Sequence, residues 1–324
     1  LDSVRRAVPS HWQDKADELR RLRQEGRGSL PAFLADSGLE LEDVYAGTKS
    51  WSDLQEAAGA PLRPRGPKET QLRRACGRLL HVDDRERLDG YRHLLKLDGP
   101  PAYGGRSDRP ARLARMLVSS LLDQAVDKAA TLDDGLELIW DHPQVRSELM
   151  EMFEFLAARI DHQHFALANH PNIPLQVHAR YTRLEILAAF QHRNSAKAPP
   201  WQTGVQWVDD ENAELLAITL DKTKGHFSPT TRYRDYAISP ELVHWESQSA
   251  TRADSEKGLR YQHHVQQGSA IMLFARLLQS ERAFWFLGPA TYVGHEGERP
   301  MAVTWRLQWP LPGDLFSSFA AAVA

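Results

Sequence analysis

The spacing of apolar positions changes along the chain, and the change divides it into two regions. Up to about residue 190 the apolar residues recur every three or four positions, which is typical of amphipathic helices. We expect one such stripe to be helix core, and it comprises Leu149, Met152, Phe153, Leu156 and Ile160. From Trp201 onward apolar and polar residues alternate, which predicts β-strands.

Capping residues predict where individual helices begin and end. Ser or Thr followed three residues later by an acidic residue can satisfy backbone N–H groups of the first turn. The pattern occurs at Ser50 and Asp53, at Thr131 and Asp134, and at Thr182 and Glu185, the last of which predicts a helix over 183–191. An earlier helix is expected between Ser10 and Gly26, and Gly59 is expected to end the one that starts at Ser50.

Residues 30–47 predict two short helices on either side of Gly38. Their outline resembles a helix-turn-helix motif. The second helix, however, carries Glu40, Glu42 and Asp43 where a DNA-reading helix needs Arg, Asn or Gln. The pattern therefore favours a structural helical hairpin.

The strand candidates after Trp201 are 204–208, 214–220, 242–248, 269–276, 283–293 and 301–309. Several strands with few helices between them predict a mostly antiparallel β-barrel-like sheet, with corners at Gly288-Pro289 and at 294–297. The chain is thus expected to be α+β, with an all-helical connector over 1–180 and a β-rich domain over 181–324. A Ser/Ala/Lys/Pro-rich loop or hinge is expected at 194–200.

The composition narrows the class of protein. A formal net charge of −3 shows no global basic excess, so nucleic-acid binding must come from local patches. No run approaches the roughly 20 apolar residues of a membrane helix, and no membrane partner is expected. The single cysteine, Cys76, rules out an internal disulfide and favours a reducing compartment such as a bacterial cytoplasm. The start, LDSVRRAVPSHW, has no Met and no signal sequence, which suggests a piece of a longer protein.

The densest basic stretch is RPRGPKETQLRRACGR, residues 63–78. The only acidic residue in this stretch is Glu69. Its basic side chains could neutralise DNA phosphates, and they are Arg63, Arg65, Lys68, Arg73, Arg74 and Arg78. A solvated loop and helix face is the alternative interpretation of the same run.

Motifs of known catalytic chemistry are missing from the chain, which has no GxxxxGK[ST], GxGxxG, HExxH or GxSxG. His162 and His164 are too few to form a metal site by themselves, and neither metal nor cofactor is expected. Ser228, His244 and Asp235 supply the residue types of a hydrolase triad, but a proline follows the serine and no glycine-flanked turn presents it. The chain as it stands is not expected to be an enzyme.

Residues 227–249, FSPTTRYRDYAISPELVHWESQS, concentrate rings and short polar side chains around a proline-marked turn. A flipped base needs a flat ring beside it and polar groups at its pairing edge. Rings come from Tyr233, Tyr236 and Trp245, and donors and acceptors from Asp235, Ser247 and Gln248. Candidate phosphate contacts are Ser228, Thr230, Thr231, Arg232, Arg234, Arg252, Lys257 and Arg260, and Tyr261 joins the same set. An ordinary strand core would also show the alternation of Tyr236 with Ile238 and of Val243 with Trp245.

The order of four segments carries a resemblance: AITLDKTKGHFSPTTRYRDYAISPELVHWESQS, GLRYQHH, IMLFAR and FWFLGPATYVGHEGERPMAVTWRL. Together, over about residues 181–312, they resemble a domain of unassigned function at the C-terminus of bacterial superfamily 2 DEAD/DEAH-type helicases. Those proteins often carry a phospholipase D-like nuclease. The segment SLPAFLADSGLELEDVYAGTKSWSDLQEAAG is similar to the connector that follows their motor.

Some proteins of that architecture are ATP-dependent type IV restriction enzymes, which cut DNA containing 5-methylcytosine. The resemblance implies that this chain is their target-recognition part, with double-stranded DNA and the helicase and nuclease domains of the same polypeptide as partners. Modified-base readers such as SRA and PUA-like domains use curved β-barrels, which agrees with the strand pattern by analogy. The alternative is a protein-interaction or regulatory module that docks on the motor without reading a base.

Overall fold

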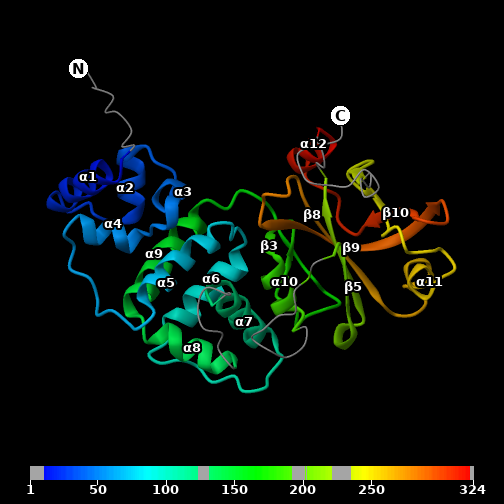
Figure 1. Cartoon of the computed structure of the whole chain (residues 1–324), viewed down its shortest axis with the longest axis horizontal. Helices are drawn as coiled ribbons and strands as arrows, with labels where there is room; N and C mark the ends of the chain where they lie inside the picture. Colours follow the sequence, from blue (N-terminus) through cyan, green and yellow to red (C-terminus); the bar gives the residue numbers. More distant parts are fainter. Residues whose placement is uncertain (1–10, 123–130, 192–200, 202, 221–234, 322–324) are drawn as a thin grey trace. The chain divides into compact units, whose positions relative to one another are not determined.

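The computed structural model describes residues 11–122, 131–191, 201, 203–220 and 235–321. The chain divides into a helical unit, residues 1–161 with 194–197, and a β-rich unit, residues 162–193 and 198–324 (Figure 1). The α+β class and the order of helices before sheet are confirmed. The hinge expected at 194–200 lies outside the described residues.

The helical unit is built mainly from α-helices. They are α1 (Trp12–Gln24), α2 (Leu30–Ser37), α3 (Leu41–Val44), α4 (Trp51–Ala57), α5 (Glu69–Cys76), α6 (Arg85–Leu95), α7 (Arg109–Leu121), α8 (Leu132–Trp140) and α9 (Pro143–Ala158). The longest, α9, packs against α2, α4, α5, α6 and α8. Its buried positions include Leu149, Met152, Phe153 and Leu156, as the apolar stripe predicted, whereas Ile160 lies beyond its end.

The predicted caps hold these helices as expected. The Ser50 hydroxyl accepts a hydrogen bond from the backbone N–H of Asp53 at 3.1 Å, and Thr131 forms a complete capping box with Asp134. The hairpin over 30–47 is confirmed, because α2 ends at Gly38 in the left-handed conformation before α3 begins. α1 begins after His11, which makes no side-chain cap, and Ser10 lies outside the described residues.

The expectation of helix up to residue 180 is wrong for its last part. Residues 165–182 contain the short strands β1 (Phe165–Ala166), β2 (Gln176–Val177) and β3 (Arg180–Thr182). β1 pairs with β2, and β3 pairs with β9. Strands of two or three residues are too short to show an alternating pattern, and their hydrogen-bond partners are set by tertiary structure. The helix predicted next is confirmed as α10 (Arg183–Ala189), with the Thr182–Glu185 capping box.

Every predicted strand after Trp201 is present. The strands are β4 (Val205–Val208), β5 (Ala213–Thr219), β6 (Tyr236–Ala237), β7 (Leu242–Glu246), β8 (Ala270–Arg276), β9 (Ala283–Glu296) and β10 (Ala302–Leu307). They form one sheet in the order β4-β5-β8-β9-β10-β7-β6, with β3 beside β9. β5 and β8 run parallel and the other pairs antiparallel, and Figure 1 shows β9 as a long bent strand between β8 and β10. Two further helices complete the unit, α11 (Glu256–His263) and α12 (Gly313–Ala321).

The sheet is not closed into a barrel, so the barrel expectation is wrong. In the described part of the chain β4 and β6 form the two ends of the strand order and do not pair with each other. Alternation reveals that a strand has one buried face, but it carries no information about whether the end strands hydrogen-bond. Val205 of β4 and Ala237 of β6 nevertheless belong to one core cluster together with Trp305 of β10. The sheet therefore curls strongly while remaining open.

The corner expected at Gly288-Pro289 is a bulge within one continuous strand. β9 runs through both residues, and its register with β8 shifts opposite Leu273 and Phe274. Gly288 has φ of +96°, and a Cβ there would lie 3.1 Å from both methyl groups of Val177. This backbone conformation and the close approach of β2 explain why glycine occupies the position.

Candidate functional site

A cavity of about 470 Å³ lies between the β4–β5 side of the curled sheet and β7, and we call it the seam pocket. Strands near opposite ends of the strand order line it together, which is a direct result of the curl. Its lining consists of Arg183, Thr203, Gly204, Val205, Ala217, Thr219, Asp235, Trp245, Glu246, Gln248, Ser249, Arg276 and Gln279. Three of these, Asp235, Trp245 and Gln248, are residues that the sequence predicted for base recognition.

Trp245 forms the apolar wall of the seam pocket and at the same time part of the core. Its ring packs edge to face on Tyr261, with centroids 5.4 Å apart, and lies 6.2 Å from the ring of Trp305. Only 4% of its surface is exposed. Trp245 therefore has no free ring face for a base, and Tyr261, fully buried beside it, is a core residue too.

Asp235 and Gln248 bring polar atoms to the same cavity. One Asp235 carboxylate oxygen accepts a hydrogen bond from the backbone N–H of Glu246 at 2.9 Å, which fixes the side chain beside β7. The Gln248 Oε1 atom accepts one from Lys257 Nζ at 3.2 Å. Among the described residues none accepts a hydrogen bond from Gln248 Nε2, so this donor is available to a ligand.

Among the residues that the structure describes, the other predicted ones do not line the seam pocket. Tyr236 stacks on His244 with centroids 4.7 Å apart, and His244 alternates with Trp245 along β7 and so faces the other side of the sheet. Arg260 is neutralised by Glu214, with Nε and Oε2 2.8 Å apart, and its guanidinium lies over the Trp207 ring. Six more predicted residues lie outside the described residues: Ser228, Thr230, Thr231, Arg232, Tyr233 and Arg234.

The basic stretch 63–78 is only partly a basic surface. Arg73 is buried, with 2% of its surface exposed, and it pairs with Asp53, Glu56 and Glu69. Arg65 also pairs with Glu56. Asp53 and Glu56 belong to α4, and Glu69 belongs to the stretch itself. The stretch alone contains one acidic residue, so the sequence did not reveal that two further carboxylates neutralise its arginines. Arg63 and Arg74 are exposed, and Lys68 is half-buried.

The two histidines considered as metal ligands do not form such a site. His162 Nε2 lies 2.8 Å from a carboxylate oxygen of Asp314, at the start of α12. In the parts of the chain that the structure describes, no group of three or more His, Cys, Asp or Glu side chains could hold a metal ion.

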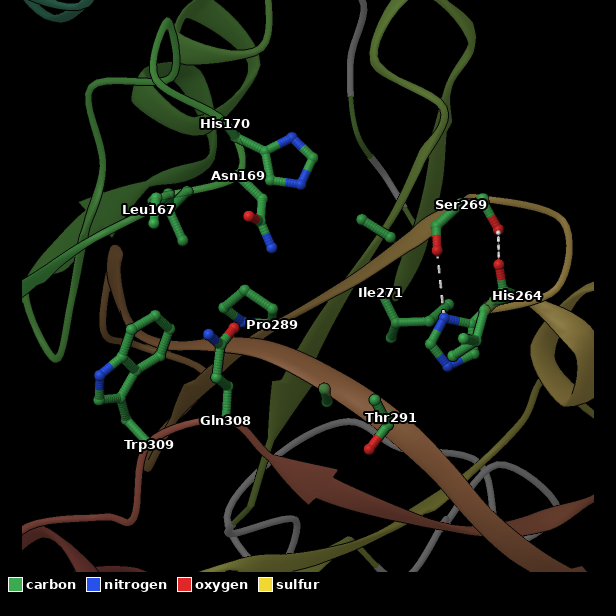
Figure 2. Close-up of a pocket in the computed structure, with 15 residues that line it drawn as sticks. Leu167, Asn169, His170, His264, Ser269, Ile271, Pro289, Thr291, Gln308 and Trp309 are labelled. Atoms are coloured by element: carbon green, nitrogen blue, oxygen red, sulfur yellow. Dashed lines mark hydrogen bonds between the residues drawn. The ribbon is translucent and has the colours of Figure 1, made fainter.

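A second cavity, of about 440 Å³, lies against β8 and β9 (Figure 2). In Figure 2, Asn169 and His170 lie on the opposite side of the cavity from Gln308 and Trp309. His264 forms part of its wall, with Nδ1 3.2 Å from the Ser269 carbonyl oxygen and Nε2 accepting from the backbone N–H of Tyr292. Burial lowers the pKa of His264, and both ring nitrogens are occupied, so it is a structural residue and not a proton donor to a ligand.

Two residues of the seam pocket, Arg183 and Arg276, carry no local signal that sequence reasoning could use. Arg183 is the first residue of α10 and Arg276 the last residue of β8, and 93 positions separate them. An arginine at a helix start or a strand end is usually a solvated residue. Only the curl of the sheet shows that both face the cavity of Asp235 and Gln248.

A comparison with protein families gives a match within the β-rich unit. A search among curated proteins found no match to the chain. No helix in the described ranges has the length and apolar character needed to cross a membrane. Residues 175–319, from the start of β2 into α12, match the protein family described as Domain of unknown function (DUF3427).

Proposed function

We propose that the β-rich unit recognises DNA that carries a modified base, such as 5-methylcytosine, by receiving the flipped base in the seam pocket. The observation that carries this proposal is the meeting of Asp235, Gln248 and two arginines around one cavity of about 470 Å³. Pockets for small ligands have volumes of ~300–1,000 Å³ and combine apolar walls with a few polar groups that fix orientation. The seam pocket has both properties.

The polar groups suit the pairing edge of cytosine. A cytosine offers an exocyclic amino donor beside two acceptors, and a carboxylate accepts from the amino group while an amide N–H donates to an acceptor. Asp235 and Gln248 supply these two types of group. Trp245 contributes apolar surface to the pocket and rigidity through its core contacts.

The methyl group of a modified cytosine supplies little energy, which makes an enclosing pocket useful. One buried methylene-sized group is worth about 0.8 kcal/mol of transfer free energy. A pocket that surrounds the base can use nearly all of that contact and read the pairing edge at the same time. Flipping therefore permits discrimination that a contact in the open groove would not.

In the wider protein we propose that this chain is the non-catalytic, target-recognising part of an ATP-dependent, modification-dependent helicase–nuclease. The helical unit would connect recognition to the motor of the same polypeptide, and the site of action would be DNA in a bacterial cytoplasm. The order of segments described above and the match of residues 175–319 to a domain family support this reading without naming a substrate.

The test is a titration of the whole chain against one duplex in two forms, one with 5-methylcytosine and one with cytosine, at fixed moderate salt. We expect tighter binding of the methylated form. Asp235→Asn keeps the shape and the acceptor for the Glu246 N–H but loses the negative charge, and Gln248→Ala removes the amide. Each should weaken binding of the methylated duplex about 10-fold, because a good base-edge contact contributes ~1–3 kcal/mol. The preference over plain cytosine should change little, because both bases present the same pairing edge.

The matched control is Asp254→Asn, since Asp254 is an exposed carboxylate of the same unit that does not line the seam pocket. It should leave the affinity for both duplexes unchanged. Equal binding of the two duplexes would contradict recognition of 5-methylcytosine. Absence of binding to either duplex would favour an interaction module that docks on the motor.

A further inference from the structure

Arg183 and Arg276 form a pair of cations on one aromatic ring at the wall of the seam pocket. The guanidinium carbon of Arg276 lies 4.5 Å from the centre of the Phe284 ring, and that of Arg183 lies 5.4 Å from it. Phe284 is buried in β9, with 1% of its surface exposed, and so provides a rigid support. Stacking on an aromatic face holds an arginine in place without occupying its N–H groups.

Each arginine is also held by neutral oxygens and not by carboxylates. Arg276 donates from Nε to Thr219 Oγ1 at 3.0 Å and from one terminal nitrogen to the Glu281 carbonyl oxygen. Arg183 donates to the Trp201 carbonyl oxygen at 3.0 Å. Within the described residues neither forms an ion pair with Asp or Glu. Other arginines of the described chain, by contrast, have a carboxylate within 4 Å, as Arg21, Arg65 and Arg252 do.

The pair therefore holds positive charge that is only weakly compensated. Burial, and next the charge of Arg183, lower the pKa of Arg276 to about 10, against a smaller opposing effect of Glu281. Burial also lowers the pKa of Arg183. Both groups still carry a proton near pH 7, so two like charges face one cavity, and an anion bound between them would relieve their repulsion.

The hydrogen-bonding capacity left over matches an oxyanion. A guanidinium has five N–H donors, of which Arg276 uses two and Arg183 one in the described contacts. Arg183 Nε is buried and has no hydrogen-bond partner among them. Planar forks of this kind bind the oxygens of a phosphate in pairs, and such charge-assisted bonds are stronger than neutral ones.

We propose that Arg183 and Arg276 form a phosphate-binding subsite of the seam pocket, which holds the phosphate attached to the nucleotide whose base enters it. The capacity to bind a phosphate rests on the arginine pair alone. The assignment of that phosphate to DNA rests, in addition, on the proposed function. Asp235 and Glu246 also line the cavity, and their negative charge would keep the phosphate at the arginine side.

The experiment titrates the whole chain with 5-methyldeoxycytidine, with its 5′-monophosphate and with inorganic phosphate, by calorimetry. We expect the monophosphate to bind about 10–100-fold more tightly than the nucleoside, the range that corresponds to ~1.5–3 kcal/mol for hydrogen bonds to a charged group. Inorganic phosphate should compete with the monophosphate. Arg276→Gln should remove the difference between nucleoside and monophosphate.

Two variants separate this effect from loss of structure. Arg306→Gln removes an exposed arginine of β10 that lies outside the seam pocket, and it should leave all three affinities unchanged. Arg276→Lys keeps a positive charge but loses the planar fork, and it should retain part of the phosphate effect. Thermal unfolding of each variant shows whether Arg276→Gln is folded; if it is not, Arg276→Lys and Arg183→Gln carry the comparison.

The outcomes distinguish the two proposals. Equal binding of nucleoside and monophosphate, or a phosphate effect that survives in Arg276→Gln, would overturn the subsite even if the chain prefers methylated DNA. Inorganic phosphate binding that depends on Arg276, together with equal binding of methylated and plain duplex, would retain the phosphate site and overturn the modified-base function. Binding of inorganic phosphate but of no nucleotide would overturn the assignment to DNA.

Discussion

Trp245 and Tyr261 pack edge to face with their ring centroids 5.4 Å apart, in a core that faces the seam pocket. One ring comes from the middle of β7 and the other from α11. The contact joins the wall of the pocket to α11, so the shape of the pocket depends on the packing of the core.

Trp245→Ala should therefore destabilise the β-rich unit by about 3–5 kcal/mol, the usual cost of removing a buried aromatic side chain. Trp245→Phe should cost less, because it keeps an aromatic ring against Tyr261. Urea unfolding followed by circular dichroism measures both. A Trp245→Ala variant of native stability that has lost its preference for modified DNA would show instead that the ring acts on the ligand.

Gly288→Ala should destabilise the same unit by about 1–3 kcal/mol, because φ of +96° strains any residue with a Cβ and the new methyl would press on Val177. The control lies six residues along β9. A Cβ at Gly294 meets nothing within 4 Å, so Gly294→Ala should change stability by at most about 0.5 kcal/mol. Similar losses for the two variants would contradict a special role of the bulge at Gly288.

Arg73→Ala should cost about 3–5 kcal/mol in the helical unit, since it leaves the buried carboxylate of Glu69 without its partner. The neighbouring Arg74 is exposed, and Arg74→Ala should be within about 0.5 kcal/mol of the parent chain. Denaturant unfolding compares the two. If Arg73→Ala instead weakened DNA binding at unchanged stability, the basic stretch would be a phosphate-contacting surface after all.

Glu148 should make the helical unit less stable as pH rises. Its two carboxylate oxygens accept backbone N–H groups of Trp51 and Ser52 at the start of α4, and burial raises its pKa from 4.5 to about 7. The folded state thus binds more protons than the unfolded state between these values. The free energy of unfolding should therefore fall between pH 4.5 and pH 7, by on the order of 3 kcal/mol at ~1.4 kcal/mol per pKa unit, and the loss should be complete above pH 7.

The slope of unfolding free energy against pH tests this, with Glu148→Gln as the comparison. The amide does not titrate, so the slope over this range should be smaller in the variant, whatever its absolute stability. Glu151, whose pKa burial also raises, keeps its own contribution in both proteins. Parallel slopes for the two proteins would mean that Glu148 is already ionised throughout the range.

The local structure of this protein follows closely from its sequence because short-range physics decides it. Ser50, Thr131 and Thr182 predicted helix starts through hydrogen bonds to residues three positions away, and the alternation of Met301, Val303, Trp305 and Leu307 predicted a half-buried strand. These signals involve neighbours along the chain. β3 escaped prediction because its partner β9 is distant in sequence, and β1 and β2 because strands of two residues are too short to show an alternating pattern.

Local patterns in the chain therefore predicted most of the elements, their order and a cluster of candidate residues that includes Asp235 and Gln248. Long-range contacts, in contrast, leave the sheet open, make Trp245 and Tyr261 part of the core, and bury Arg73 among acids from two helices. The same contacts bring Arg183 and Arg276 to one aromatic ring and one cavity. The physical reason is the same in each case: exposure, charge compensation and closure depend on which distant segments meet, and hydrophobic periodicity records only that a face is buried.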